Sequence, residues 1–185
     1  MRPKKIIVNT SDGKYPILIG KNVSFELGNL LRQNNIFSSK ILLVIDKNVP
    51  KTMVKKIKIS LKKKKYFIYL KSNEKNKSQK SVDKIIDILL KNNFNRSDVI
   101  IAAGGGIIGD FAGFVASILK RGINFINLPS TLLAQADSSI GGKTGVNSNK
   151  GKNLIGSFYQ PKVVITELGF LESLSRRNLI CGFAE

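Results

Sequence analysis

The sequence predicts an α/β protein built on a mostly parallel β-sheet, with helices on both faces and an N-terminal β-hairpin at one edge. Strand-like and helix-like patterns alternate along the chain, and several of the strand-like runs are apolar without interruption. A glycine-rich turn also joins one such strand to a helix. Strands that are apolar throughout need cover on both faces, which a parallel sheet flanked by helices provides.

The hairpin is predicted at the N-terminus, where two β-rich runs, residues 5–8 and 15–19, flank Ser11-Asp12-Gly13. It would add an antiparallel edge to the sheet. Strands and helices are then expected to alternate. The expected strands are residues 41–45, 66–70, 99–103, 125–128 and 163–166. The expected helices, recognised by apolar residues at helical spacing, are residues 49–61, 81–90, 107–119 and 131–140.

The last segment of the chain is predicted to be helical. Ser175 is suited to cap a helix over residues 176–185. Neither a glycine cap nor a proline closes this helix. We therefore expect the helix to belong to a longer protein.

Composition places limits on the class of protein. A length of 185 residues suits one domain or slightly more, and a hydrophobic fraction of 42% supports a folded core. No apolar run reaches the roughly 18 residues that a membrane span needs, and polar residues soon follow the basic N-terminus, unlike a secretory signal. A single cysteine, Cys181, rules out an internal disulfide. We expect a cytoplasmic protein with no membrane partner.

The net charge of +19 raises the alternative of a nucleic-acid-binding protein. Lysines are spread along the chain, however, and are densest at 62–65 and 71–80, with no interleaved aromatic residues and no recognisable nucleic-acid-binding motif. This favours a solvated basic surface, which can also attract anionic substrates. Histidine is absent, so histidine acid–base chemistry and histidine–metal sites cannot be built from these residues alone.

The glycine-rich turn predicts a phosphate site. Gly104, Gly106 and Gly109 satisfy the G-x-G-x-x-G spacing between a strand and a helix. Glycine lets the backbone approach a pyrophosphate, whose charge is met by amides at the helix N-terminus. The loop lies deep in the chain, and strand 125–128 is not followed by an acid that could bind a ribose. We therefore predict that Asp46 accepts those hydrogen bonds; the alternative is a turn required only for packing.

A second glycine- and lysine-rich segment, residues 141–156, is interpreted as a long functional loop. Within it, residues 142–144 resemble the end of a P-loop. Asp137 occupies the place of the earlier glycine, and the segment follows a helix, so we reject a nucleoside-triphosphatase. Lys143, Lys152 and Asn153 could hold a phosphate or a carboxylate. Three exposed polar side chains without a ligand remain the open alternative.

Together these segments resemble the N-terminal half of the 3-dehydroquinate synthase family of sugar-phosphate cyclases. The segments that carry the resemblance are residues 104–114, 121–122, 128–135, 137–144, 151–156 and 182–185. The resemblance covers nearly the whole chain. It implies a Rossmann-like NAD-binding domain over residues 1–174 and, over residues 175–185, the start of a helical metal-binding domain whose remainder is missing.

The resemblance also implies residue roles. Cofactor-contacting positions of the family match Asp46, Asn48, Glu74, Lys77, Gly105, Gly106, Ile107, Ile108, Gly109, Asp110, Ser130, Thr131, Leu133, Lys143, Lys152, Phe170, Leu171, Glu172 and Ser173. Substrate-pocket and catalytic positions match Asp137, Lys143, Lys152, Asn153 and Arg121. Arg121 corresponds to a residue that reaches the substrate phosphate of a neighbouring subunit, which implies a homodimer. Glu185 corresponds to a carboxylate ligand of the catalytic zinc, for which cobalt can substitute.

The reaction implied by the resemblance converts 3-deoxy-D-arabino-heptulosonate 7-phosphate to 3-dehydroquinate and phosphate, in the shikimate pathway of aromatic amino acid biosynthesis. NAD transiently oxidises the substrate, phosphate is eliminated, and an intramolecular aldol reaction closes the ring. The alternatives are a related sugar-phosphate cyclase, a polyol dehydrogenase, or a catalytically dead NAD-binding remnant.

The 185 residues by themselves are expected to be inactive, because the family's two zinc-binding histidines correspond to positions beyond residue 185. Cys181 is a candidate substitute ligand, which we interpret instead as a buried packing residue.

Overall fold

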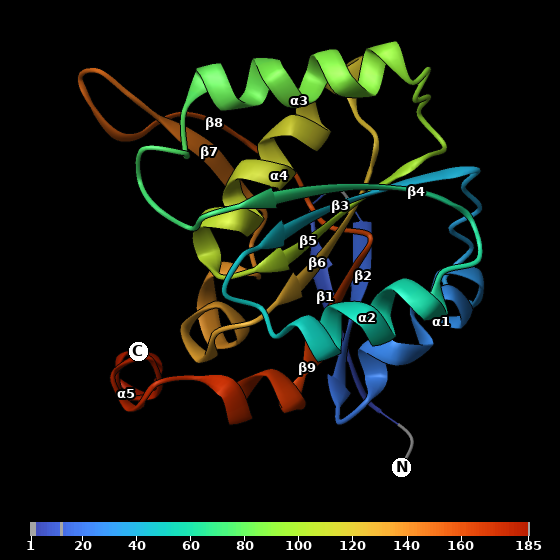
Figure 1. Cartoon of the computed structure of the whole chain (residues 1–185), viewed down its shortest axis with the longest axis vertical. Helices are drawn as coiled ribbons and strands as arrows, with labels where there is room; N and C mark the ends of the chain where they lie inside the picture. The colour runs from blue at the N-terminus through green and yellow to red at the C-terminus, as the bar shows by residue number, and fades with distance from the viewer. Residues whose placement is uncertain (1–2, 12, 185) are drawn as a thin grey trace.

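The computed structural model describes residues 3–11 and 13–184 and contains a seven-stranded sheet in the order β1-β2-β9-β6-β5-β3-β4 (Figure 1). The strands are β1 (Lys4–Thr10), β2 (Gly13–Gly20), β3 (Lys40–Asp46), β4 (Lys64–Leu70), β5 (Val99–Gly104), β6 (Asn124–Pro129) and β9 (Val163–Glu167). The helices are α1 (Leu27–Gln33), α2 (Lys51–Ser60), α3 (Gln79–Lys91), α4 (Gly106–Ile118) and α5 (Arg176–Phe183). Shorter helical turns are η1 (Val23–Glu26), η2 (Leu119–Arg121), η3 (Ala134–Ser138) and η4 (Leu168–Ser173).

Helices cover both faces of the sheet, as predicted. On β3, the side chains of Ile41, Leu43 and Ile45 pack in the core beneath α1 and α2. Leu42 and Val44 face the opposite way, into the core beneath α3 and α4. All five are at most 1% exposed. Because successive strand residues point to opposite faces, an uninterrupted apolar strand is what two covered faces require.

The N-terminal hairpin is also confirmed. β1 pairs antiparallel with β2, from Lys4 opposite Ile19 to Thr10 opposite Gly13. β2 then runs parallel to β9. The hairpin therefore supplies the antiparallel edge of an otherwise parallel sheet. Asp12, part of the predicted turn, lies outside the described residues.

Two helical predictions need adjustment. α2 begins at Lys51 rather than at residue 49, since Pro50 holds the N-cap position, where its missing amide costs no helical hydrogen bond. The helix expected over residues 131–140 is shorter than predicted: it covers residues 132–138, most of which form the π-helical turn η3. No element was predicted within residues 21–39, which contain η1 and α1. α1 has only seven residues, too few to show helical periodicity clearly.

The interpretation of residues 141–156 as a loop was wrong. Strands β7 (Lys143–Ser148) and β8 (Gly151–Phe158) form a separate antiparallel hairpin. It lies against α4, outside the main sheet (Figure 1). At the contact, a Cβ atom on Gly113 of α4 would come within 2.5 Å of Thr144 Cγ2. The missing side chain at Gly113 thus allows the hairpin to approach the helix.

The connections out of β3 and β5 create a crevice at the carboxyl ends of these neighbouring strands. α2 follows β3 and packs on one face of the sheet, through Val54 and Ile57. α4 follows β5 and packs on the other face, through Ile108 and Phe111. Where successive helices leave to opposite faces, parallel α/β sheets bind their ligands.

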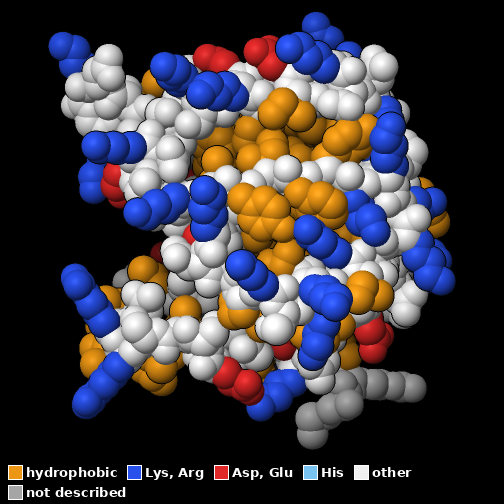
Figure 2. All heavy atoms as spheres, in the orientation of Figure 1, with side chains coloured by type: hydrophobic (Ala, Val, Ile, Leu, Met, Phe, Trp, Pro, Cys, Tyr) orange, Lys and Arg blue, Asp and Glu red, His pale blue; other side chains and the backbone are white. Residues whose placement is uncertain are grey.

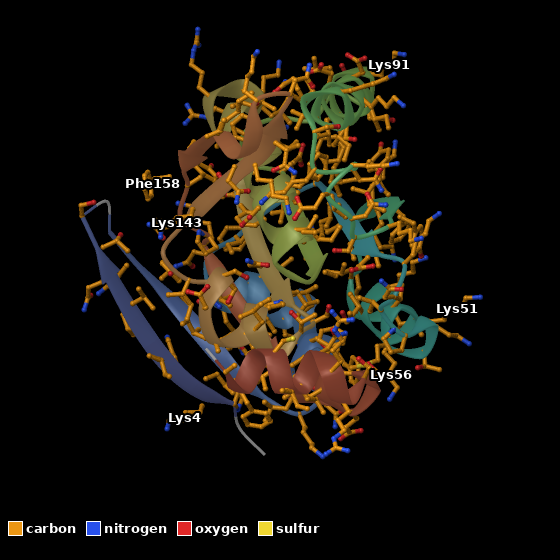
Figure 3. The ribbon with its side chains drawn as sticks, turned by 90° about the vertical axis from the view of Figure 1, so that its left-hand side faces the viewer. Lys4, Lys51, Lys56, Lys91, Lys143 and Phe158 are labelled. Carbon is orange, nitrogen blue, oxygen red and sulfur yellow. The ribbon has the colours of Figure 1, made fainter. Side chains whose placement is uncertain are left out.

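Positively charged side chains are spread over the surface rather than gathered in one patch. Figure 2 shows lysine and arginine side chains distributed around one face, with apolar side chains gathered between them. On the sides seen in Figure 3, Lys51 of α2 and Lys91 of α3 point outward into solvent, whereas the ammonium group of Lys56 lies over the Phe25 ring, 4.6 Å from its centroid. Within the described ranges, no helix has the length and apolar character needed to cross a membrane.

Candidate cofactor and substrate site

A cavity of about 600 Å³ opens in the crevice at the carboxyl ends of β3, β5 and β6. Its lining residues are Asp46, Asn48, Val49, Pro50, Ser72, Gly105, Ser130, Thr131, Ser173, Leu174, Ser175 and Asn178. Segments far apart in the sequence therefore meet here, and six of the predicted cofactor positions are among them. We call this cavity the crevice site.

Asp46 closes β3 and is 5% exposed. Its Oδ1 accepts a hydrogen bond from the amide of Asn48 at 3.0 Å, which fixes the turn into α2. A carboxylate can accept several hydrogen bonds at once, so this one contact leaves acceptor capacity for the hydroxyl groups of a ribose. The geometry suits the role predicted for Asp46.

The glycine turn leaves no room for side chains. A Cβ atom on Gly104 would lie 2.7 Å from the side chain of Ile108 and 3.1 Å from Asp46 Cβ. One on Gly106 would lie 2.7 Å from Ser138 Oγ. The N-cap residue of α4, Gly105, supplies no side-chain hydrogen bond, and the first turn contains no acidic residue. The first amides of α4 are thus left for a ligand, an arrangement that fits a pyrophosphate.

A largely buried ion pair, in which the Asp110 side chain stays 25% exposed, lies beside the glycine turn. The ammonium group of Lys77, whose side chain is 5% exposed, contacts the carboxylate of Asp110 on α4. The same ammonium donates a hydrogen bond to Asn153 Oδ1 on β8. Three segments, the one preceding α3, the start of α4 and the β7–β8 hairpin, are joined through this one cation.

Burial governs the protonation of Asp110. It raises the pKa of the Asp110 carboxyl above its ordinary value, because the charged form loses contact with water. The Lys77 ammonium opposes this rise, whereas the negative charges of Asp137 and Glu74 reinforce it. The ionised state of Asp110 therefore depends on Lys77.

A second network, at the surface, ties the segment before α3 to the β7–β8 hairpin. Asn147 Nδ2 donates to Glu74 Oε2 at 2.7 Å, and Asn147 Oδ1 accepts from the amide of Asn153 at 3.0 Å. Lys152 Nζ lies 3.3 Å from Glu74 Oε1. The hydrogen bond from Asn147, followed by Lys152, lowers the pKa of Glu74. Glu74 is consequently held as a carboxylate that orients Lys152.

A second cavity, of about 590 Å³, lies between η3, α4 and the hairpin. Its lining residues are Asp110, Asp137, Ser138, Ile140, Gly141, Lys143, Thr144, Gly145, Asn153, Leu154, Gly156, Ser157 and Phe158. Figure 3 shows Lys143 and Phe158 near one another on the hairpin, where they are cross-strand partners. We call this cavity the hairpin site. It contains three of the predicted substrate residues, Asp137, Lys143 and Asn153.

Residues 67–181 match the model of the 3-dehydroquinate synthase N-terminal domain. The chain belongs to the 3-dehydroquinate synthase family. It is 53% identical over 182 residues to the 3-dehydroquinate synthase of Pelagibacter ubique (strain HTCC1062), covering 98% of this chain and 50% of that protein. It is 44% identical over 188 residues to that of Alkaliphilus metalliredigens (strain QYMF), with the same coverage. The chain thus spans about half the length of these curated relatives.

Solved structures show the same relationship. The structure of a 2-deoxy-scyllo-inosose synthase, complexed with carbaglucose-6-phosphate, NAD+ and Co2+, superimposes with a TM-score of 0.88 at 25% identity. The match covers 97% of this chain and 50% of that one. A probable glycerol dehydrogenase from Sinorhizobium meliloti 1021, at 14% identity and a TM-score of 0.71, shares the fold. The Rossmann-like fold predicted from the sequence is confirmed.

Some positions inferred from the 3-dehydroquinate synthase family lie away from both cavities. Arg121 is exposed at the far end of α4 from the glycine turn, where it and Lys120 adopt left-handed backbone conformations with φ of 61° and 52°. The side chains of Ile108 and Phe170 are buried in the core and line neither cavity. Gly109 packs against Asn127.

Two expectations at the C-terminus have different outcomes. Glu185, the residue assigned to the metal of 3-dehydroquinate synthases, lies outside the described residues. Cys181 is exposed, so its interpretation as a buried packing residue was wrong; α5 buries Gly182 instead, whose Cβ position lies 2.6 Å from Leu132. Residues 3–11 and 13–184 contain no group of three or more histidine, cysteine, aspartate or glutamate residues arranged to hold a metal ion.

Sequence reasoning missed Ser72 and Asn178 of the crevice site, and Asn147 of the surface network beside the hairpin site. Asn147 had a usable signal, since Asn147-Ser148-Asn149-Lys150-Gly151 has the composition of a tight turn. Ser72 and Asn178 enter the crevice site only through tertiary packing, and no local pattern marks them.

Proposed function

We propose that this chain is the cofactor-binding half of a 3-dehydroquinate synthase and binds NAD in the crevice site. The proposal rests on the crowded glycine turn at Gly104–Gly106, which opens α4 beside the Asp46 carboxylate. The pyrophosphate would lie on the first amides of α4, and a ribose would face Asp46. NAD bound to the related 2-deoxy-scyllo-inosose synthase supports the assignment. Titration calorimetry tests it: saturable binding of one NAD is expected, and no heat at millimolar NAD would overturn it.

The substrate proposed for the complete protein is 3-deoxy-D-arabino-heptulosonate 7-phosphate, bound in the hairpin site. NAD, when bound, would accept a hydride from the carbon that bears a substrate hydroxyl, while the hydroxyl proton is released as the carbonyl forms, and would return the hydride to that carbon after phosphate has left. Lys143 and Lys152 supply positive charge for the phosphate, and Asn153 supplies a neutral hydrogen-bonding group. Lys77 holds Asn153 and Asp110 in fixed positions in the wall of the hairpin site. Arg121 of a second copy would complete the phosphate site in a homodimer.

Exposed apolar side chains beside these sites support the proposal that more protein surrounds them. They are Leu133 at 38%, Leu154 at 64%, Phe158 at 77%, Ile180 at 56% and Phe183 at 80% exposure. Neighbouring apolar groups left in water usually mark a contact surface. We propose that a helical domain carrying the divalent metal, zinc or cobalt, covers this surface, with Glu185 as one ligand.

A related sugar-phosphate cyclase is the second candidate. Its support is the likeness to a 2-deoxy-scyllo-inosose synthase that binds carbaglucose-6-phosphate, another phosphorylated sugar analogue. Phosphate-binding lysines suit both substrates, so these residues do not separate them. Turnover of the complete protein would be measured with the heptulosonate phosphate and, separately, with the hexose phosphate that carbaglucose-6-phosphate mimics. Only the matching substrate should release phosphate, which would distinguish the two candidate functions.

Asp46→Asn should weaken NAD binding without unfolding the protein. The amide keeps the shape but loses the charge, and hydrogen bonds to charged groups contribute roughly 1.5–3 kcal/mol, so the Kd should rise about 10- to 100-fold. Calorimetry gives the Kd, and Asp87→Asn, at an exposed position on α3, is the matched control. An unchanged Kd for Asp46→Asn would point to another ribose acceptor.

A polypeptide of these 185 residues should release no phosphate from the heptulosonate substrate, even with NAD and zinc supplied. A catalytic zinc usually has three protein ligands, and the sequence contains no histidine. Copies of the same polypeptide cannot supply the missing ligands to one another. Phosphate release is compared with that of an Arg121→Ala, Lys152→Ala double variant. Turnover by the unaltered polypeptide above this background would show that these residues suffice for catalysis.

A further inference from the structure

Glu167, at the carboxyl end of β9, is a carboxylate buried to 1% exposure. Its Oε1 accepts hydrogen bonds from the amides of Asn22 at 2.8 Å and Gly169 at 3.0 Å. Its Oε2 accepts from the amide of Ser24 at 3.0 Å and from Ser24 Oγ at 2.9 Å. Four neutral donors therefore meet the buried charge. A buried carboxylate is tolerated only when its oxygens are satisfied in this way.

The four donors belong to two segments that are distant in the sequence. Asn22 and Ser24 form the turn after β2, in which Asn22 adopts a left-handed conformation with φ of 63°. Gly169 is in the first turn of η4, which Glu167 caps. The Glu167 side chain thus joins the turn after β2 to η4. In addition, Gln135 Nε2 donates to the backbone oxygens of both Glu167 and Pro129, tying the ends of β9 and β6 together.

η4 leads directly into one wall of the crevice site. Ser173, Leu174 and Ser175 line that cavity, as does Asn178 of α5. Ser175 also caps α5 by accepting from the amide of Asn178 at 3.3 Å. The position of this wall relative to Asp46 is consequently set where η4 begins, at Glu167.

We infer that Glu167 is a positioning residue for the cofactor, because its carboxylate fixes η4 and thereby the wall of the crevice site. The inference rests on the proposed binding of NAD there. Glu167 itself does not line the crevice site, so its effect on affinity is transmitted through η4. Preorganisation of this kind strengthens binding because the ligand does not have to order the wall.

Glu167→Gln is the principal test. Glutamine keeps the volume of glutamate, but its NH2 group replaces one carboxylate oxygen. That group is a donor, so it cannot accept the two hydrogen bonds that the replaced oxygen now accepts. We expect amide hydrogen exchange to become faster across residues 168–175 and the Kd for NAD to rise about 10-fold. Both are measured at a temperature where circular dichroism shows the variant fully folded. Glu26→Gln removes the same charge from an exposed position of η1 and should change neither quantity.

Ser24→Ala provides a second variant if Glu167→Gln does not fold. It removes one donor to Glu167 and leaves the carboxylate in place, so a Kd increase of about 3-fold is expected. A lower melting temperature with unchanged exchange in 168–175 and unchanged Kd would overturn the inference and leave Glu167 a purely stabilising residue. Absence of NAD binding by the unaltered protein would instead overturn the proposed function. In that case the inferred effect on affinity fails as well, and exchange alone decides whether Glu167 holds η4.

Discussion

Gly106→Val is expected to abolish measurable NAD binding while the sheet stays folded. A Cβ atom at this position lies 2.7 Å from Ser138 Oγ, so a valine side chain would push the start of α4 away from η3. The first amides of the helix would then no longer lie where they can meet a pyrophosphate. We expect a loss of at least about 100-fold, or about 2.8 kcal/mol, in calorimetric titrations.

The matched control is Gly20→Val at the end of β2. There a Cβ atom would make only ordinary contact, 3.5 Å from Pro3 Cα, and the site lies outside the crevice lining. A sharper test uses alanine: Gly106→Ala should weaken binding, and adding Ser138→Ala should restore part of it by removing the hydroxyl that the new methyl group meets. Wild-type affinity in Gly106→Val would show that the pyrophosphate does not bind at this turn.

The sheet could be predicted from the sequence because burial on both faces leaves a direct mark. β3 is apolar from Ile41 to Ile45 and β5 from Val99 to Ala103, and the polar or glycine residue that ends each strand, Asp46 or Gly104, lies where the crevice opens. The strand-end position, together with the lack of an acid after strand 125–128, therefore identified Asp46 as a candidate ligand residue. Helix ends were less predictable, as Pro50 illustrates, since local backbone chemistry rather than periodicity sets them.

The β7–β8 hairpin could not be predicted by the same means. One face of the hairpin contacts α4 through Thr144 and buries Val146, while its other face leaves Leu154 and Phe158 exposed. Apolar and polar residues therefore do not alternate as they do in a strand with a buried face. The composition, rich in glycine and lysine, resembles that of a loop.

The cluster of Lys77, Asp110 and Asn153 was also beyond reach from residue patterns alone. Asp110 lies 33 positions and Asn153 lies 76 positions after Lys77 in the sequence, and no local pattern links the three residues. The family resemblance singled out each residue for contact with a ligand. Their contacts with one another, which join the segment before α3, α4 and β8, are visible only in the folded structure.

Lys77→Met should be among the most destabilising single substitutions in the molecule. Methionine fills much of the lysine volume but leaves the Asp110 carboxylate buried without its cation and removes the donor to Asn153. Breaking a buried ion pair by removing one partner costs about 3–5 kcal/mol, which corresponds to a melting temperature lower by roughly 6–20 °C for a chain of this size. Thermal unfolding followed by circular dichroism measures the shift.

Lys152→Met is the matched control, because it removes an equal charge from an ion pair with Glu74 whose side chains are 69% and 48% exposed. Exposed pairs contribute at most about 1 kcal/mol, so its melting temperature should stay near that of the wild type. Equal effects of the two methionine substitutions would show that burial of the Lys77–Asp110 pair does not matter for stability.

The loss of folding stability caused by Lys77→Met should also depend on pH. Titration of Asp110 decides whether this loss grows or shrinks as pH rises. Burial already raises the pKa of Asp110 above its ordinary value of 3.8, and removing Lys77 raises it further. A carboxyl whose pKa is higher in the folded state carries no penalty below its unfolded pKa; the penalty grows as pH rises from the unfolded pKa to the folded pKa and is complete above it. The difference in stability between wild type and variant should therefore be larger at pH 8 than near pH 4. Adding Asp110→Asn should remove most of this pH dependence, since the unpaired charge is then gone; a gap that stays constant with pH would mean that Asp110 is not the group left uncompensated.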